Sequence, residues 1–175
     1  MPSIRLFAIA VAVILSCRFA AAEQSSIPNP MIDYRGFLEN AVKVQNLRNQ
    51  RRISEADFLR LAGEPGTIVL DARSDAKFAM LHVKGAKHLS LPDVTAEELA
   101  QIIPDKSTRV LIYCNNNFLN EPRAMPGKFT AASLNLYTFN TLYSYGYTNV
   151  YELGPLIDIN KSILPFEGTL VASRR

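Results

Sequence analysis

Cysteine and histidine are both scarce in this chain of 175 residues, which has two of each. A zinc site takes about four cysteine, histidine or carboxylate ligands, usually in closely spaced groups. The histidines, His82 and His88, stand without the further ligands that such a site needs, because the nearest cysteine is the distant Cys114. The sequence therefore predicts no metal site, and we expect no organic cofactor.

The sequence also lacks a run of apolar residues long enough to remain in a membrane as a helix. Near its start, Leu6–Leu15 is an apolar stretch of about ten residues, roughly half of what a transmembrane helix needs. Small residues follow at Ala20–Ala22, which is the pattern of a signal peptide cut before Glu23. We therefore expect an exported protein, periplasmic or secreted, without a permanent membrane span. A second interpretation stays open, in which Cys17 carries a lipid that anchors the protein.

Neither sign of charge is in large excess. Lysine and arginine number 19 and aspartate and glutamate 16, a net charge of +3 that falls to about +1 once residues 1–22 are removed. Proteins that bind nucleic acid usually concentrate basic charge, so we expect no nucleic-acid partner. The basic group Arg48, Arg51 and Arg52 is favourable at the end of a helix, and we interpret it as a solvated helix end rather than a phosphate site.

Removal of the signal peptide leaves Cys114 without a disulfide partner in its own chain, although exported proteins often contain such pairs. The residue follows the apolar run Val110–Tyr113 and precedes a loop. A thiol placed where a buried strand meets a loop and then a helix can be held as a thiolate, because amides at a helix N-terminus favour negative charge. Cys114 is therefore either buried and inert or reactive, and it is the first candidate for chemistry.

Apolar runs and capping residues predict strands that alternate with helices. Buried strands are expected at Thr67–Leu70, Val110–Tyr113 and Asn149–Leu153, with an edge strand at Lys87–Leu89. Helices are expected over residues 32–52, 54–61, 74–80, 95–103 and 130–145. Such alternation indicates an α/β fold, with a parallel sheet covered by helices on both faces. Ligands of these sheets lie at the carboxyl ends of the strands, which is the position of Cys114.

Short motifs in the middle of the chain resemble the rhodanese domain in order and, outside the active-site loop, in spacing. They are Leu70–Arg73, Phe78, His82–Ala86, Val110–Cys114, Gly146–Val150, Leu153–Gly154 and Leu164–Pro165. The resemblance implies a rhodanese-like three-layer domain with a central parallel sheet of about five strands and helices on both faces. The helix expected over residues 32–52 is an extra N-terminal helix, since it precedes the part of the chain that carries the resemblance. With the expected signal peptide at residues 1–22 and a mostly helical extension at 23–52, the resemblance assigns the rhodanese-like domain to residues 53–168 and leaves a tail at 169–175.

The resemblance implies that Cys114 is a nucleophile that accepts sulfane sulfur as a persulfide. The partners would be a small sulfur-containing donor, such as thiosulfate, and a thiol or other nucleophilic acceptor. This chemistry needs loop amides that stabilise charge on the outer sulfur, and a cation that holds an anionic donor. We predict substrate-binding roles for six loop residues: Asn115, Asn116, Asn117, Phe118, Arg123 and Lys128. The resemblance gives Asp71, Arg73 and His82 structural roles near the site.

The loop after Cys114 departs from the family pattern. Ordinary members have an arginine a few positions after the cysteine, where this chain has Leu119, and the path to Gly146 is about twice as long as usual. Either Arg123 or Lys128 folds back over the thiol in place of that arginine, or both are solvated loop charges. A phosphatase would need an arginine at Asn120 to clamp phosphoryl oxygens, so the sequence argues against that class.

The leading hypothesis is an exported rhodanese-like sulfurtransferase in which Cys114 carries sulfur. One alternative is a non-catalytic rhodanese-fold module that binds a protein partner through the long loop and the helix at residues 32–52. Another is a redox-sensing protein in which the thiol of Cys114 is oxidised reversibly.

Overall fold

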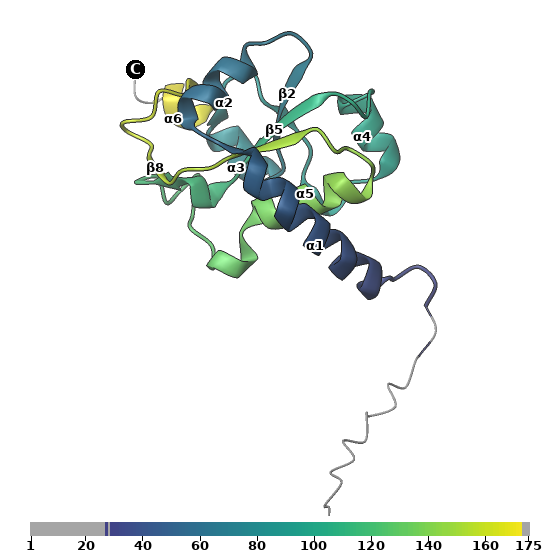
Figure 1. Cartoon of the computed structure of the whole chain (residues 1–175). Coiled ribbons are helices and arrows are strands. Elements are labelled where there is room, and N and C mark those ends of the chain that lie inside the picture. Colours follow the sequence, from purple (N-terminus) through teal and green to yellow (C-terminus); the bar gives the residue numbers. More distant parts are fainter. Residues whose placement is uncertain (1–26, 28, 173–175) are drawn as a thin grey trace, which may run out of the picture. The chain divides into compact units, whose positions relative to one another are not determined.

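The computed structural model describes residues 27 and 29–172 (Figure 1). The expected signal peptide, its cleavage site and Cys17 lie outside the described residues, as does the end of the expected tail. A compact unit begins at Asp33, and all helices and strands of the described chain belong to it.

A five-stranded parallel sheet forms the centre of this unit. The strand order is β1 (Arg52–Ile53), β7 (Val150–Leu153), β5 (Arg109–Tyr113), β2 (Thr67–Asp71) and β4 (Lys87–His88). Every neighbouring pair is parallel, and β5 lies in the middle with β7 on one side and β2 on the other. The prediction of a central parallel sheet of this size is confirmed.

The side chains of β5 alternate between two apolar cores, one on each face of the sheet. Leu111 and Tyr113 belong to one core, whereas Val110 and Ile112 belong to the other, and all four are at most 1% exposed. A strand covered on both faces has no solvent side, so its sequence is a continuous apolar run rather than an alternating one.

Helices cover both faces, which completes the predicted three layers (Figure 1). One face packs against α2 (Glu55–Ala62), α3 (Asp75–Met80) and α6 (Thr169–Ala172). The other packs against α1 (Tyr34–Arg51), α4 (Ala96–Ile102) and α5 (Leu134–Ser144). The predicted N-terminal helix is α1, which lies along α5 and contributes Val44 to the core.

Local capping explains where several helices begin and end. Ser54 accepts the amide of Asp57 at the start of α2, and Thr95 forms a reciprocal capping box with Glu98 at the start of α4. Gly146 ends α5 with a φ of 86°, a left-handed conformation that glycine adopts without strain. Residues 54 and 95 are also where the sequence predicted the starts of these two helices.

Two predictions about element boundaries are wrong. The helix expected over residues 130–145 is interrupted at Ser133, which separates the 3₁₀ turn η3 (Thr130–Ala132) from α5. The helix expected to reach Arg52 ends one residue earlier, because Arg52 pairs with Glu152 as part of β1. Pairing with β7 outweighs the helical preference at Arg52, and at Ser133 the backbone is extended, with φ of −60° and ψ of 128°.

Short elements outside the central sheet were not predicted from the sequence. They are β3 (His82–Val83) paired with β9 (Phe166–Glu167), β6 (Phe118–Leu119) paired with β8 (Ile157–Asp158), and the 3₁₀ turns η1 (Leu91–Asp93) and η2 (Asn115–Asn117). A strand of two residues is too short to show a periodic pattern in the sequence, so these strands are recognised only by their pairing with distant segments.

The described residues include neither a membrane-spanning helix nor a cluster of metal ligands. No helix among them combines the length and apolar character needed to cross a membrane. Within the same part of the chain, no three side chains of histidine, cysteine, aspartate or glutamate are grouped as they would be around a metal ion.

Candidate functional site

Cys114 lies directly after β5, at the carboxyl edge of the central sheet. Its thiol is free and only 1% exposed, and Sγ lies 3.4 Å from Oγ of Ser133. Ser133 occupies the break between η3 and α5, so this interruption of the helix brings a hydroxyl to the thiol. This distance fits a weak hydrogen bond that involves sulfur, and either atom can be the donor.

The backbone after Cys114 closes a tight turn. The amide of Asn117 donates to the carbonyl of Cys114 at 3.1 Å, and the amide of Phe118 donates to the carbonyl of Asn115. These two amides therefore stabilise η2 itself. Phe118 is buried and packs edge-to-face on Tyr113, which makes it part of the apolar core.

Asn117 holds the backbone of Cys114 in place through its side chain. Its Oδ1 accepts the amide of Cys114 at 2.9 Å and Nδ2 of Asn135 at 3.1 Å. Its Nδ2 donates to the carbonyl of Leu153 at 2.7 Å. The side chain thus ties the cysteine to β7 on one side and to α5 on the other.

Asn116 closes the base of the long loop. Its Nδ2 donates to the carbonyl of Lys128 at 2.8 Å, and its Oδ1 accepts the amide of Lys128 at 3.0 Å. Asn115 and Lys128 line one cavity, of about 450 Å³, together with Lys77. Arg123 is exposed, and its carbonyl accepts Nζ of Lys77.

A different cavity, of about 400 Å³, contains Cys114. Its walls come from the end of α1, the turn η2, the start of α5 and the end of β7. Within the described part of the chain, its lining includes neither Arg123 nor Lys128. Its charged residues are instead Arg48, Arg52 and Glu152. The cations that accompany the cysteine therefore come from the N-terminal helix and its junction with β1.

Glu152 holds Arg48 firmly at this cavity and lies near Arg52. Its carboxylate is 4% exposed and forms two hydrogen bonds with Arg48, from Nε and, at 2.6 Å, from Nη2. Nε of Arg52 lies 3.9 Å from the same carboxylate, and Nη2 of Arg52 donates to the carbonyl of Gly154 at 2.7 Å. The planar guanidinium of arginine suits such paired contacts, and the two hydrogen bonds to Glu152 keep the Arg48 side chain in one position.

Sequence reasoning missed these residues because it treated the basic helix end as solvated. One signal was available: Glu152 is a charged residue within the otherwise apolar run Val150–Leu153. A buried carboxylate requires a cationic or hydrogen-bonding partner. Arg48 and Arg52 are four positions apart, a spacing that puts both on one side of the helix expected over residues 32–52.

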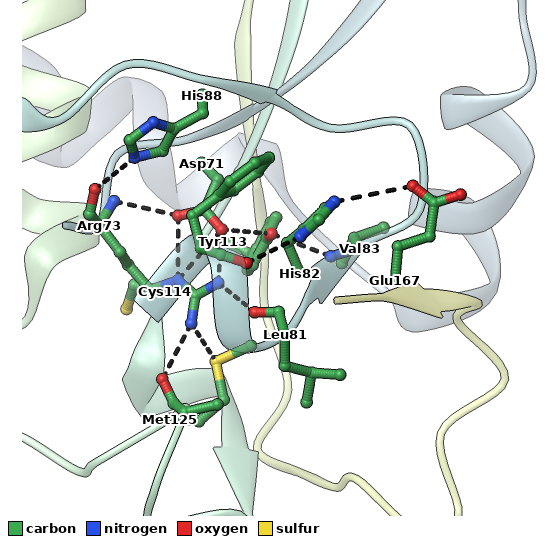
Figure 2. A network of polar contacts seen from close by, with 12 residues as sticks. Asp71, Arg73, Leu81, His82, Val83, His88, Tyr113, Cys114, Met125 and Glu167 are labelled. Atoms are coloured by element: carbon green, nitrogen blue, oxygen red, sulfur yellow. Dashed lines mark hydrogen bonds and ion pairs between the residues drawn. The ribbon is translucent and has the colours of Figure 1, made fainter. Parts of the chain in front are cut away.

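Asp71 and Arg73 form a buried ion pair (Figure 2). Asp71 pairs with Tyr113, whose side chain belongs to the core on the opposite face of the sheet from this cavity. Nε of Arg73 lies 2.9 Å from Oδ1 and 3.1 Å from Oδ2 of Asp71. Nη1 of Arg73 also donates to the carbonyl of Ala124 and to Sδ of Met125, at 3.0 and 2.8 Å. The pair therefore anchors the middle of the long loop to the end of β2.

The charge state of Arg73 follows from its surroundings. Burial alone lowers the pKa of Arg73, but the hydrogen bonds and charge of Asp71, with a smaller contribution from Tyr113, raise it above its ordinary value. The guanidinium is thus a permanent cation that Asp71 neutralises.

His82 stacks on Phe78 with 3.8 Å between ring centroids, and its Nδ1 lies 2.8 Å from the Phe78 carbonyl. Its Nε2 lies 3.6 Å from the carboxylate of Glu167 (Figure 2). His82 therefore joins α3 to β9, away from the lining of the Cys114 cavity in the described chain.

Comparison with known proteins identifies the domain. The family model for the rhodanese-like domain matches residues 54–154, a stretch that begins after α1. The BH2092 protein of Bacillus halodurans is 19% identical, with a TM-score of 0.50 over 76% of this chain and 88% of that chain, which shows a shared fold.

Two further solved structures are similar. The Alr3790 protein of Anabaena sp. is 25% identical, with a TM-score of 0.47 over 70% of this chain and 86% of that chain. A rhodanese with anions from E. coli is 26% identical, with a TM-score of 0.40 over 58% of this chain and 98% of that chain. A search of curated proteins found no match. On the family match over residues 54–154, this chain belongs to the rhodanese-like domain family, whose members are generally sulfurtransferases.

Proposed function

We propose that the protein is a sulfurtransferase in which Cys114 carries sulfane sulfur as a persulfide. The observation that carries this proposal is the placement of a free thiol at the carboxyl end of β5, in a cavity that it shares with two arginines. Membership of the rhodanese-like family supports the same chemistry.

The transfer consists of two substitutions at sulfur. The thiolate of Cys114 attacks the outer sulfur of a donor such as thiosulfate, and a new S–S bond forms as the S–S bond of the donor breaks. Sulfite leaves with the bonding electron pair. An acceptor thiolate then attacks the outer sulfur of the persulfide, and Cys114 leaves as a thiolate. No external oxidant or reductant takes part, because sulfur is transferred at its existing oxidation level.

Two residues support Cys114 in this scheme. Ser133, at 3.4 Å, donates a hydrogen bond to the anionic sulfur before attack and after release. Asn117 keeps the cysteine backbone in a fixed position while the bond to sulfur forms and breaks. The arrangement reduces the reorganisation that the reaction needs.

Mass spectrometry of the intact protein after incubation with thiosulfate tests the proposal. The expected product is an adduct of one sulfur atom, released by a thiol acceptor and accompanied by sulfite. The Cys114→Ser variant is the control, because it keeps the size of the side chain and removes the nucleophile. Absence of a Cys114-dependent adduct with thiosulfate, a thiosulfonate and a polysulfide would contradict the proposal.

A second candidate function is binding of a protein partner without catalysis. It is favoured by the apolar side chains that α1 presents to solvent, such as Leu38 and Val42, which are 46% and 62% exposed. Copurification that survives Cys114→Ala, and is lost when residues 118–128 are shortened, would support this candidate. A sulfenate or mixed disulfide at Cys114 without sulfur transfer would instead indicate a redox-sensing thiol.

We further propose that the protein is exported and that residues 1–22 are its signal peptide. The support is the short apolar stretch followed by Ala20–Ala22. N-terminal sequencing of the protein purified from its native compartment should begin at Glu23. A lipid-modified Cys17 at the N-terminus would show the anchored form instead.

A further inference from the structure

We propose that Arg48 and Arg52 form an anion-binding site for the sulfur donor, so that the helix preceding the family domain completes the site around Cys114. The donor class is a sulfane-sulfur compound with an oxyanion end, as in thiosulfate. The identity of the donor rests on the proposed sulfurtransferase function. The anion site itself is a property of the cavity, and it can be tested without any sulfur transfer.

The register of the sheet places the arginines and the cysteine on one face. Arg52 pairs with Glu152, and Glu152 pairs with Ile112, so the three residues form a row across β1, β7 and β5. Cys114 continues the extended backbone two residues after Ile112, with φ of −148° and ψ of −176°. Side chains two apart in a strand share a face. The thiol therefore points to the face that α1 and α5 cover, as its contact with Ser133 shows.

The balance of charge in the cavity favours an anion. Two guanidinium groups line it against the single carboxylate of Glu152, so the lining residues other than Cys114 carry an excess of one positive charge. Glu152 is buried, and it holds Arg48 through two hydrogen bonds. Arg52 is the looser of the two, because its nearest approach to that carboxylate is 3.9 Å and its side chain is 47% exposed. Arg52 is thus the better placed to turn toward a ligand.

A buried acceptor without a partner also lines this cavity. Oδ1 of Asn135 has no hydrogen-bond partner among the described residues, and Asn135 is 2% exposed. Its orientation is set by Asn117, whose Oδ1 accepts both Nδ2 of Asn135 and the amide of Cys114. A buried carbonyl of this kind is costly unless a water molecule or a ligand donates to it. The cavity therefore offers two kinds of group. The arginines can hold an anionic sulfur donor, and Oδ1 of Asn135 can accept a hydrogen bond from the acceptor thiol that follows it.

The relative rates at which Cys114 is alkylated by iodoacetate and iodoacetamide test the anion site. The sulfur displaces iodide from either reagent, and the reagents differ mainly in their charge. The neutral reagent corrects for any change in thiol reactivity. In the Arg52→Gln variant, we expect the rate ratio of iodoacetate to iodoacetamide to fall by about threefold to tenfold, as loss of one nearby charge in a partly screened cavity predicts.

Arg51→Gln is the matched control. Arg51 is adjacent in sequence and carries the same charge, but it donates to the carbonyl of Thr148 and lies over the ring of Tyr151, outside the lining of the cavity. In the Arg51→Gln variant, the rate ratio of iodoacetate to iodoacetamide should stay at the wild-type value. Glu152→Gln should raise the ratio, because the excess positive charge of the cavity increases. If Arg51→Gln and Arg52→Gln lower the ratio equally, or if neither does, the inference is wrong.

Thiosulfate loading separates this inference from the proposed function. Arg52→Gln should raise the thiosulfate concentration for half-maximal persulfide formation by about threefold to tenfold, while the maximal amount of adduct stays unchanged. Normal loading of Arg52→Gln together with an unchanged alkylation ratio would overturn the anion site and leave the sulfurtransferase intact. A lowered alkylation ratio without persulfide in any variant would support the anion site and contradict sulfur transfer.

Discussion

Tyr113 connects the buried Asp71–Arg73 ion pair to the backbone of β3 at the end of the sheet. Its hydroxyl donates to Oδ2 of Asp71 at 2.6 Å and accepts the amide of Val83 at 3.0 Å (Figure 2). Burial, and then the negative charge of Asp71, raise the pKa of Tyr113 well above its ordinary value of 10.0. The phenol therefore stays protonated at neutral pH and helps to orient Asp71 toward Arg73.

Tyr113→Phe should lower the free energy of unfolding by about 1 to 3 kcal/mol at pH 7, because a buried carboxylate loses a donor and the amide of Val83 loses its acceptor. The raised pKa means that the neutral phenol stabilises the folded state, fully below pH 10 and progressively less as the pH rises above it. The stability difference between wild type and variant should therefore narrow above pH 10. Urea denaturation of both proteins at pH 7 and pH 10.5 measures this stability difference. A difference that stays constant between the two pH values would contradict a raised pKa of Tyr113 in the folded protein.

The long loop at residues 115–128 is an ordered element. Ala124 and Met125 are buried in the core, 0% and 2% exposed, and Arg73 bonds to both. β6 adds a two-residue pairing with β8, and the paired contacts of Asn116 and Lys128 close the base. A loop of this length is usually either functional or mobile, and these contacts hold this one against the sheet.

Asn116→Ala should loosen the base of this loop and lower the free energy of unfolding by about 1 to 2 kcal/mol, because two hydrogen bonds to Lys128 are lost. Trypsin should then cut faster after Arg123 and Lys128. Asn149→Ala is a suitable control, since it removes a hydrogen bond to the carbonyl of Ser107 in another loop. Equal cleavage rates in the two variants would show that Asn116 does not hold the loop closed.

The loop also shows why part of the site could not be predicted from the sequence. Apolar runs such as Val110–Tyr113 indicated buried strands, since burial on both faces needs only local composition. The partners of β6 and Arg73 lie far along the chain, at Ile157–Asp158 and at Ala124, and no periodicity marks them. The sequence therefore indicated the sheet and the cysteine, whereas the contacts that position the loop depend on tertiary structure.

At the scale of the whole molecule, the N-terminal helix belongs to the same compact unit as the family domain. Val44 of α1 is 5% exposed in the core that it shares with α4 and α5. Arg48 of α1 neutralises the carboxylate of Glu152, which is part of β7 within the matched region. The boundaries of the family match thus exclude a helix on which a buried charge of the domain depends.

A double-mutant cycle measures this dependence. Arg48→Met should lower the free energy of unfolding by about 2 to 4 kcal/mol, because it leaves the buried carboxylate of Glu152 without its principal partner. The expected loss of stability is smaller than for breaking a fully buried ion pair, because the side chain of Arg48 is 22% exposed. Glu152→Gln removes the charge, so the Arg48→Met/Glu152→Gln protein should recover part of the loss. The cycle needs urea denaturation of wild type and three variants, and additive effects of the two substitutions would show that Arg48 and Glu152 do not stabilise one another.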